Sequence, residues 1–478
     1  MRGSGGQEHM GAPVSELLIA GGTVVTADRM EPADVLIRDG RIADVGQDLT
    51  TGGEVLDARG HWVMPGGIDT HTHLAHPIDR LGITTADDFH TGTVAGACGG
   101  VTTIIDFSLQ RRGETLALAR DRRLGEIAPD AVIDYGFHTI VTDVRDDVIA
   151  EVPELIGGGF PSFKVYMTYG DKIVNDDGLL RLLEATGANG GLLYVHCEND
   201  CAVTYLINQH LSDGKTGPAY HAPSRPPVVE AEATHRAIML AGVVGAPLCI
   251  AHVTSSGAAG HVAAARERGD PVVAETCPQY LVLDDTVYDP CGGFEVAKFV
   301  CSPPMRAAEH RDALWSALAD GSIQQVSSDH APFRYRDQKT TGRDNFTRIP
   351  NGLPGIETRL PLVFAGGVST GLISPQRFVE LASTNPARIF GMYPRKGTLD
   401  AGADADVIVV DPEAETEIDA ARLHSAVDYS PFQGMRVRGF PTWTISRGEI
   451  IVDRGEPVAE RGRGRLAERG RIDPAALP

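Results

Sequence analysis

Two histidines, His71 and His73, stand two residues apart, directly after a Pro-Gly-Gly turn and Asp69. In an extended chain, residues i and i+2 project to the same face, so both imidazoles can reach one metal ion. An isolated pair of this kind is weak evidence, because the alternative is two surface or core histidines. The preceding turn and apolar stretch predict a metal-ligand pair at the end of a β-strand.

Four further ligand-type residues stand at the ends of other apolar runs: Lys164 in SFKVYM, His196 in YVHCEN, His252 in IAHVT and Asp329 in SSDHAP. Alone, His196 and His252 could be hydrogen-bonded core histidines, and Asp329 could cap a helix. Six such residues at the ends of five separate strands instead predict one shared metal site.

Lys164 is the most unusual of the six, because it lies inside an apolar run. A buried ammonium without a partner is costly, and its pKa tends to fall. The neutral amine is a nucleophile, and its reaction with carbon dioxide would give an anionic carbamate whose two oxygens can bridge two cations. The alternative is a lysine that extends to the surface.

The residues are positioned by a repeated pattern of short apolar runs and helical segments. The candidate strands are GGIDTHTH, VTTIIDF, AVIDYGFHTIV, PSFKVYM, GLLYVHCEN, APLCIAHVT, PVVAETCPQYL and SIQQVSSDHAP. Eight strands that alternate with helices predict a (β/α)8 barrel of the TIM type, whose active sites lie at the carboxyl ends of the strands.

The flanking regions predict a second, smaller domain. Residues 16–64 contain short strand signals with a hairpin at Asp39-Gly40, and similar signals return in residues 392–455. We therefore predict a catalytic barrel over residues 65–391 and one β-sandwich domain built from both flanks.

The two ends of the chain differ in composition from the rest. We interpret residues 1–15 as an N-terminal extension whose opening Met-Arg-Gly-Ser is typical of an expression vector. Residues 456–478 form a Gly- and Arg-rich tail that includes Arg461, Arg463, Arg465, Arg469 and Arg471. We expect this tail to be solvated or to form a subunit contact.

Composition narrows the function class. A net charge of −21 argues against nucleic-acid binding, which requires clustered positive charge. The sequence contains no apolar run of about 18 residues and no signal-peptide pattern, so we expect no membrane span and no secretion. The seven cysteines have no paired spacing, which favours reduced thiols and a cytoplasmic protein.

The ordered motifs resemble one family, the dihydropyrimidinase and hydantoinase branch of the cyclic amidohydrolases, from about residue 16 to residue 455. The resemblance is carried by GGIDTHTH, TADDFHTGTVAGACGGVTTIIDF, SFKVYMTYG, VHCEN, YHAPSRPPVVEAEA, ETCPQYL, CSPPMR, SSDHAPF and IPNGLPGIETR. It implies a hydrolase that opens dihydropyrimidines or hydantoins to N-carbamoyl amino acids, as in pyrimidine catabolism. It also implies a homotetramer acting on a small cyclic ureide.

The resemblance implies a ligand set for two divalent metal ions. One ion would be held by His71, His73, Asp329 and carboxylated Lys164 (N6-carboxylysine), and the second by carboxylated Lys164, His196 and His252. We expect Zn²⁺, and these ligands also accept Mn²⁺ or Co²⁺. Two cations lower the pKa of a water held between them, so that its hydroxide can attack an amide carbonyl.

The resemblance also implies roles in catalysis and substrate binding. Asp329 would take the proton of the attacking water and pass it to the leaving nitrogen. Tyr169 matches the position whose phenol hydrogen-bonds the developing oxyanion. Main-chain groups near Ser302 and Asn351 match those that clamp the ureide edge, although Asn351 could also serve only the turn in PNGLPG.

The loop LAHPIDRLGITTADDF and Tyr166 should form the wall against the ring substituent. This loop offers Leu74, His76, Pro77, Ile78 and Leu81, whereas the family's segment is usually more aromatic and methionine-rich. This departure leaves the natural substrate open.

Three alternatives share this fold. Dihydroorotases and allantoinases have the same metal cage, but dihydroorotases typically supply an arginine close to the second histidine, where this chain has Leu74 and Ala75. A scaffold similar to the collapsin response mediator proteins would have lost the metal ligands, whereas all six positions are filled here.

Overall fold

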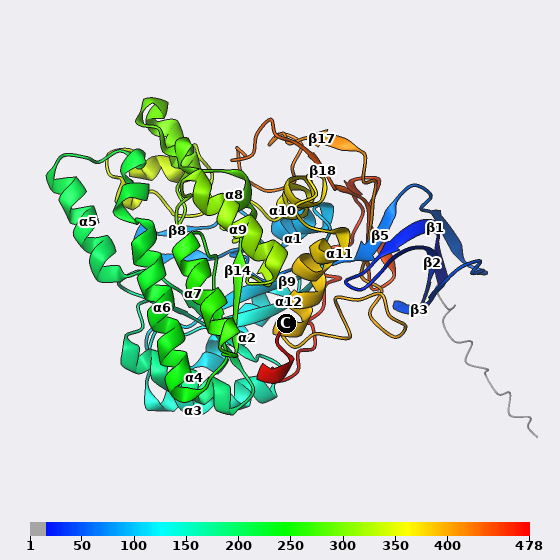
Figure 1. Cartoon of the computed structure of the whole chain (residues 1–478), viewed down its shortest axis with the longest axis horizontal. Coiled ribbons are helices and arrows are strands. Elements are labelled where there is room, and N and C mark those ends of the chain that lie inside the picture. Colours follow the sequence, from blue (N-terminus) through cyan, green and yellow to red (C-terminus); the bar gives the residue numbers. More distant parts are fainter. Residues whose placement is uncertain (1–15) are drawn as a thin grey trace, which may run out of the picture.

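The computed structural model describes residues 16–478, so the extension expected over residues 1–15 lies outside the described residues. Eight parallel strands form a nearly closed barrel surrounded by helices, and a second sheet lies beside it (Figure 1). The second sheet contains strands from both flanks of the barrel sequence. The predicted (β/α)8 fold with an additional terminal sheet region is therefore confirmed.

The barrel strands follow one another in chain order, each parallel to its neighbour. They are β6 (Gly67–Asp69), β9 (Val101–Leu109), β10 (Asp134–Ile140), β11 (Ser162–Tyr166), β12 (Leu192–His196), β13 (Leu248–Ile250), β14 (Val272–Thr276) and β15 (Gln325–Val326). Each coincides with one of the eight apolar runs. The runs are continuously apolar because helices cover the outside of the barrel and side chains fill its interior.

The barrel closes just beyond the ends of its first and last strands. Thr72 forms a parallel bridge with His330. His330 N donates to His71 O (3.2 Å), and His73 N donates to His330 O (2.8 Å). The chain segments that carry His71, His73 and the residue before His330 therefore run side by side.

Helices connect the strands and cover the barrel. They are α1 (Phe89–Cys98), α2 (Leu116–Ile127), α3 (Asp146–Gly157), α4 (Asp176–Ala188), α5 (Asp200–Ser212), α6 (Pro227–Val244), α7 (Ser256–Glu267), α8 (Pro278–Val282), α9 (Ala308–Asp320), α10 (Arg359–Val363), α11 (Pro375–Val379) and α12 (Asn385–Ile389). Capping residues in the local sequence fix where several of these helices begin. Asp88 accepts from Thr91 N (2.8 Å), and Thr91 Oγ1 accepts from Asp88 N (3.1 Å), which forms a capping box for α1. Within residues 16–478, no helix has the length and apolar character needed to cross a membrane.

The second sheet joins sequence from both sides of the barrel. Its strands are β1 (Glu16–Val25), β2 (Met30–Arg38), β3 (Arg41–Gly46), β4 (Glu54–Asp57), β5 (Trp62–Pro65), β16 (Val407–Val410), β19 (Pro441–Ser446), β20 (Glu449–Asp453) and β21 (Glu456–Pro457). β5 pairs antiparallel with β16, and Val63 lies opposite Val409. The predicted hairpin is confirmed: β2 turns into β3 at Asp39 and Gly40, whose φ angles are 52° and 75°.

Two small antiparallel pairs lie outside these sheets. β7 (Pro77–Ile78) pairs with β8 (Ile83–Thr84), and β17 (Glu415–Glu417) pairs with β18 (Arg436–Arg438). The first pair belongs to the loop that follows His71 and His73.

The C-terminal tail packs against the barrel at several points, so it is not simply solvated, and the expected subunit contact stays a prediction. Ala467 N donates to Tyr135 O (2.8 Å), and Ile472 N donates to Gly190 O (2.7 Å). These acceptors lie at the starts of β10 and β12, and the C-terminus lies against the barrel in Figure 1. The tail thus covers the amino end of the strands, opposite the end that carries the histidines.

Arg469 anchors this tail, and its replacement should destabilise the fold. Its buried guanidinium donates to Phe390 O (2.9 Å), Phe137 O (2.9 Å) and Ser162 Oγ (2.6 Å). We expect Arg469→Ala to lower the free energy of unfolding by about 2–4 kcal/mol, because buried acceptors lose their donors. Urea denaturation followed by circular dichroism measures this change. Arg465→Ala, an exposed side chain in the same tail, is the matched control. Equal midpoints for the two variants would contradict the anchoring role.

Candidate metal centre

A cavity of about 110 Å³ opens at the carboxyl end of the barrel strands. Eight of the nine predicted site residues line it: His71, His73, Tyr169, His196, His252, Ser302, Asp329 and Asn351. The ninth, Lys164, lies in β11 with a fully buried side chain. Residues from seven separated segments thus meet at one end of the barrel.

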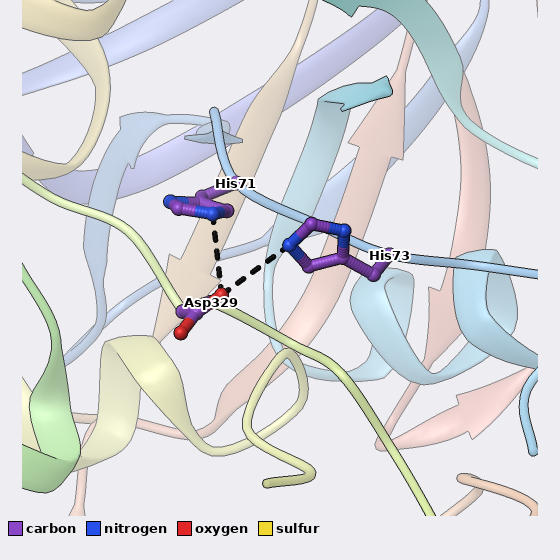
Figure 2. A group of neighbouring side chains, drawn as sticks. All are labelled: His71, His73 and Asp329. Atoms are coloured by element: carbon purple, nitrogen blue, oxygen red, sulfur yellow. Dashed lines mark ion pairs between the residues drawn. The ribbon is translucent and has the colours of Figure 1, made fainter. Parts of the chain in front are cut away.

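His71, His73 and Asp329 converge at the barrel seam (Figure 2). Asp329 Oδ1 lies 3.2 Å from His71 Nε2 and 3.5 Å from His73 Nε2. The two histidines lie just beyond the carboxyl end of β6, next to the expected strand-end position. They point the same way, because the bridge from Thr72 to His330 keeps this segment extended.

The contacts of His71 fit a cation between these three groups. Its Nδ1 lies 2.5 Å from Glu275 Oε1 and donates the hydrogen there. The lone pair on Nε2 therefore faces the Asp329 carboxylate, an arrangement that a positive ion between them would stabilise. Burial, reinforced by Lys164, lowers the pKa of His71 well below its usual value, which keeps the ring neutral and able to bind a metal.

Asp329 occupies a strongly desolvated position. Burial raises its pKa to about 7, although Lys164 acts in the opposite direction. Its backbone φ of 48° lies in the left-handed region, which is unusual for aspartate. His252 (φ 34°) and Tyr169 (φ 71°) share this feature. Backbone strain at three residues around one cavity is typical of functional sites.

Lys164 has the environment expected of a reactive amine. Its Nζ lies 3.9 Å from the centre of the Tyr194 ring and finds no hydrogen-bond partner within residues 16–478. Burial lowers its pKa to about 8, although Glu275 and Asp329 favour the charged form. A substantial share of the amine is therefore neutral near physiological pH.

His196 and His252 form the other side of the site. Their ring centres lie 4.4 Å apart, and the His252 ring lies 5.4 Å from that of His71. His196 Nε2 is engaged with Glu198 Oε2 at 2.7 Å, which leaves Nδ1 available for a cation. Burial lowers the pKa of both histidines, so both rings are neutral ligands.

Tyr169, Ser302 and Asn351 also line the cavity. Burial raises the pKa of Tyr169 to about 12, so its phenol keeps the proton that a hydrogen-bond donor needs. Asn351 Nδ2 donates to Ser302 Oγ (3.0 Å). Next to Asn351, Gly352 has a φ of 151°, and a Cβ there would approach the Ala331 backbone to 2.5 Å, so this close approach requires glycine.

The wall of the cavity agrees only partly with expectation. His76, Ile78 and Tyr166 line it as predicted. Leu74, Pro77 and Leu81 do not line it, and the Leu74 side chain is fully buried beneath α1 against Gly92. Charged side chains that the sequence analysis did not single out, Asp79, Arg80, Asp171 and Lys172, also reach the cavity.

Glu275 in β14 is the central residue that sequence reasoning missed. Its Oε1 accepts from His71 Nδ1, Tyr194 Oη and the backbone N of His252 (3.1 Å), and its Oε2 accepts from Ser327 Oγ (2.6 Å). Glu275 therefore holds His71 and His252 in place at the same time. The available signal was a glutamate inside the apolar run PVVAET, because a buried carboxylate needs several partners.

Glu198 and Arg225 are a second missed pair. Arg225 Nη1 donates to Glu198 Oε2 (2.6 Å), the same oxygen that accepts from His196. Burial raises the pKa of Glu198, but Arg225 and His196 outweigh it and lower the pKa to about 2. The carboxylate stays ionised and fixes the His196 ring, as outer partners of metal-binding histidines commonly do.

Comparisons with known proteins agree with this geometry. The Amidohydrolase family profile matches residues 62–451. The chain is 46% identical to a D-hydantoinase of Geobacillus stearothermophilus over 95% of this chain and 96% of that protein. It is 42% identical to a D-phenylhydantoinase of Escherichia coli over 96% and 100% of the two chains. The crystal structure of a dihydropyrimidinase from Brevibacillus agri superposes with a TM-score of 0.94 at 44% identity, covering 96% of this chain and 99% of that one.

The contacts of Glu275 predict its effect on metal binding. Glu275→Gln preserves shape but removes the charge that holds the tautomer of His71. We expect metal affinity to fall about 10–100-fold, measured by competition with a chelator. Glu267→Gln, at the exposed end of α7, is the matched control and should leave the affinity unchanged. Unaltered affinity in Glu275→Gln would exclude the orienting role.

Proposed function

Because this chain belongs to the amidohydrolase family, whose members are binuclear metal-dependent hydrolases, we propose that it opens the ring amide of hydantoins and dihydropyrimidines. The products would be N-carbamoyl amino acids. The observation that carries the proposal is the convergence of His71, His73, His196, His252 and Asp329 around one cavity, with Lys164 buried beside it. The hydantoinase relatives support the substrate class.

We propose that these six residues hold two divalent ions. The first ion would be bound by His71, His73 and Asp329, the second by His196 and His252, and a carbamate on Lys164 would join both. The neutral histidines and the unpartnered Lys164 amine among the described residues support this assignment. When bound, the ions would supply a hydroxide at neutral pH and polarise the amide carbonyl. Zn²⁺ suits the nitrogen and oxygen ligands, and Mn²⁺ or Co²⁺ are alternatives.

We further propose that Asp329 moves the proton of the reaction. Burial raises the pKa of its carboxyl group to about 7, so that both the protonated and the ionised form are populated near neutral pH. The group also lines the cavity. It can accept the proton of the attacking water and return it to the ring nitrogen that leaves when the amide bond breaks. The proton that enters Asp329 would therefore leave on the terminal ureido nitrogen of the N-carbamoyl product.

Substrate contacts would come from other residues that line the cavity. The protonated phenol of Tyr169 would donate to the oxygen that gains charge as the carbonyl is attacked, and burial strengthens such a bond. Ser302 and Asn351, linked by their 3.0 Å hydrogen bond, would fix the alternating N–H and C=O groups of the ureide edge. These contacts would orient the ring carbonyl toward the ligand cluster.

The alternative functions have less support. A dihydroorotase would need a cation beside His73, but Leu74 is buried away from the cavity and Ala75 is apolar. An allantoinase would share the cage, and the N–H groups of Arg80 and Lys172 at the wall would donate hydrogen bonds to the carbonyl oxygen of a ureido substituent, which makes it the second candidate. A scaffold without activity does not account for six ligand-type side chains at one site.

We also propose self-association, as expected for a homotetramer. α5 and α6 expose four large apolar side chains: Tyr205 (68% exposed), Val228 (67%), Met239 (54%) and Val243 (74%). Packing against a protein partner would remove this apolar surface from water. A second copy of the chain is the partner that fits a self-complementary enzyme of this family.

A substrate panel tests the proposed reaction. We expect ring opening of hydantoin, 5-phenylhydantoin and dihydrouracil, with N-carbamoyl products detected by mass spectrometry, and little turnover of dihydroorotate. Allantoin serves as the competing substrate. Turnover of dihydroorotate alone would overturn the assignment to this branch, and turnover of allantoin alone would favour the second candidate.

Replacement of Lys164 tests whether its carbamate joins the two metal ions. Lys164→Ala should abolish turnover and lower the bound metal, because the two ions would lose their shared ligand. A short carboxylic acid should restore part of both, since it supplies two oxygens. Lys215→Ala, an exposed lysine after α5, is the control and should keep full activity. Full activity in Lys164→Ala would remove the bridging role.

A further inference from the structure

A second group of metal-ligand side chains lies outside the cavity. Cys98 is the last residue of α1, Glu357 precedes α10, and His424 lies between β17 and β18. Their ligand atoms all lie within 4.8 Å of one another. Three segments, separated by between 67 and 326 residues along the chain, therefore bring one thiol, one carboxylate and one imidazole together.

His424 is held in one orientation by Glu357. Its Nδ1 donates to Glu357 Oε1 (2.8 Å), and its backbone N donates to Glu357 Oε2 (2.7 Å). This leaves Nε2 directed at Cys98 Sγ, 3.9 Å away. A carboxylate behind the second nitrogen is the arrangement that fixes metal-binding histidines and raises their basicity.

The separation of the sulfur and nitrogen atoms fits a cation. Zinc lies about 2.3 Å from thiolate sulfur and about 2.0–2.1 Å from imidazole nitrogen, so a tetrahedral ion spaces the two ligand atoms by about 3.6 Å. The observed 3.9 Å needs a shift of only a few tenths of an ångström. The charges also balance, because one thiolate and one carboxylate neutralise a divalent ion.

The burial of Cys98 distinguishes it from a catalytic cysteine. Cys98 is 4% exposed, whereas the His424 side chain is 28% exposed. A small ion with water ligands can enter beside His424, but an extended substrate cannot reach the sulfur. Burial also raises the pKa of the thiol, so without a cation it stays protonated and is a poor nucleophile.

We propose that Cys98 and His424, oriented by Glu357, bind one divalent cation of the Zn²⁺ and Cd²⁺ class, separate from the metal centre. The ion displaces the thiol proton, which passes to solvent as the metal–sulfur bond forms. Soft thiolate and imidazole ligands select such d¹⁰ ions over Mg²⁺ and Ca²⁺.

The site is connected to the metal centre through backbone contacts. Ile356 N, next to Glu357, donates to His330 Nδ1 (3.3 Å), and Ala426 N donates to Asp87 Oδ1 (2.7 Å). Asp87 Oδ2 in turn contacts His330 Nε2 (3.0 Å). An ion that fixes Glu357 and His424 would therefore act beside two of the contacts that hold His330, the residue after a predicted ligand.

A Cd²⁺ titration of the full-length holoenzyme tests the proposal. None of the six ligand-type residues of the metal centre is a cysteine, so the near-ultraviolet charge-transfer absorption of a cadmium–thiolate bond reports on other sites. We expect one Cd²⁺ per chain to bind with this absorption. Cys98→Ser should lose it, and Glu357→Gln should weaken binding about 10–100-fold.

Matched variants make the outcome decisive. Cys201→Ser and Cys291→Ser remove exposed cysteines and should keep the absorption. Circular dichroism and hydantoin turnover before titration confirm that each variant is folded and carries its native metals. Equal absorption in Cys98→Ser and the parent would overturn the proposal, as would its loss in Cys201→Ser or Cys291→Ser instead. Because the readout is absorption, failure here leaves the proposed hydrolase activity unaffected.

Discussion

Two backbone hydrogen bonds close the barrel beside the cavity: His330 N donates to His71 O, and His73 N donates to His330 O. This closure places the first and eighth strands in contact at their carboxyl ends. The convergence of His71, His73 and Asp329 follows directly from it. Asp69 reinforces the seam, because its Oδ1 accepts from Ser328 N (3.1 Å). The ligand cluster is therefore a property of barrel closure as well as of three side chains.

The interior behind the ligands must hold charge without water. Glu275 accepts several hydrogen bonds there, and Lys164 has an aromatic ring as its close neighbour. A fully satisfied carboxylate is stable in such a place, whereas an unpaired ammonium is not. This contrast explains why Glu275 orients its neighbours, whereas Lys164 is suited to chemical modification. Both roles arise from the same low-dielectric environment.

Much of the fold was predictable, because apolar runs mark the barrel strands and turn residues such as Asp39-Gly40 mark a hairpin. Ligand-type residues at strand ends were predictable for the same reason, since barrel topology gathers those ends. Glu275 was missed because sequence does not reveal which strand residues face the ligands. The tail was misjudged because its composition resembles a solvated segment, although Arg469 reaches buried carbonyl oxygens. The proximity of Cys98 and His424 depends on tertiary packing alone.

The pairing of β5 with β16 has a consequence for synthesis of the chain. Val63 and Val409 lie opposite each other, yet the ribosome releases Val63 on the order of tens of seconds before its partner emerges. During this interval the edge of β5 is an unpaired template for other chains. The barrel segments up to β15 can assemble meanwhile, whereas the sheet beside them must wait. Chaperone binding to the nascent chain would therefore protect β1 and β5 first.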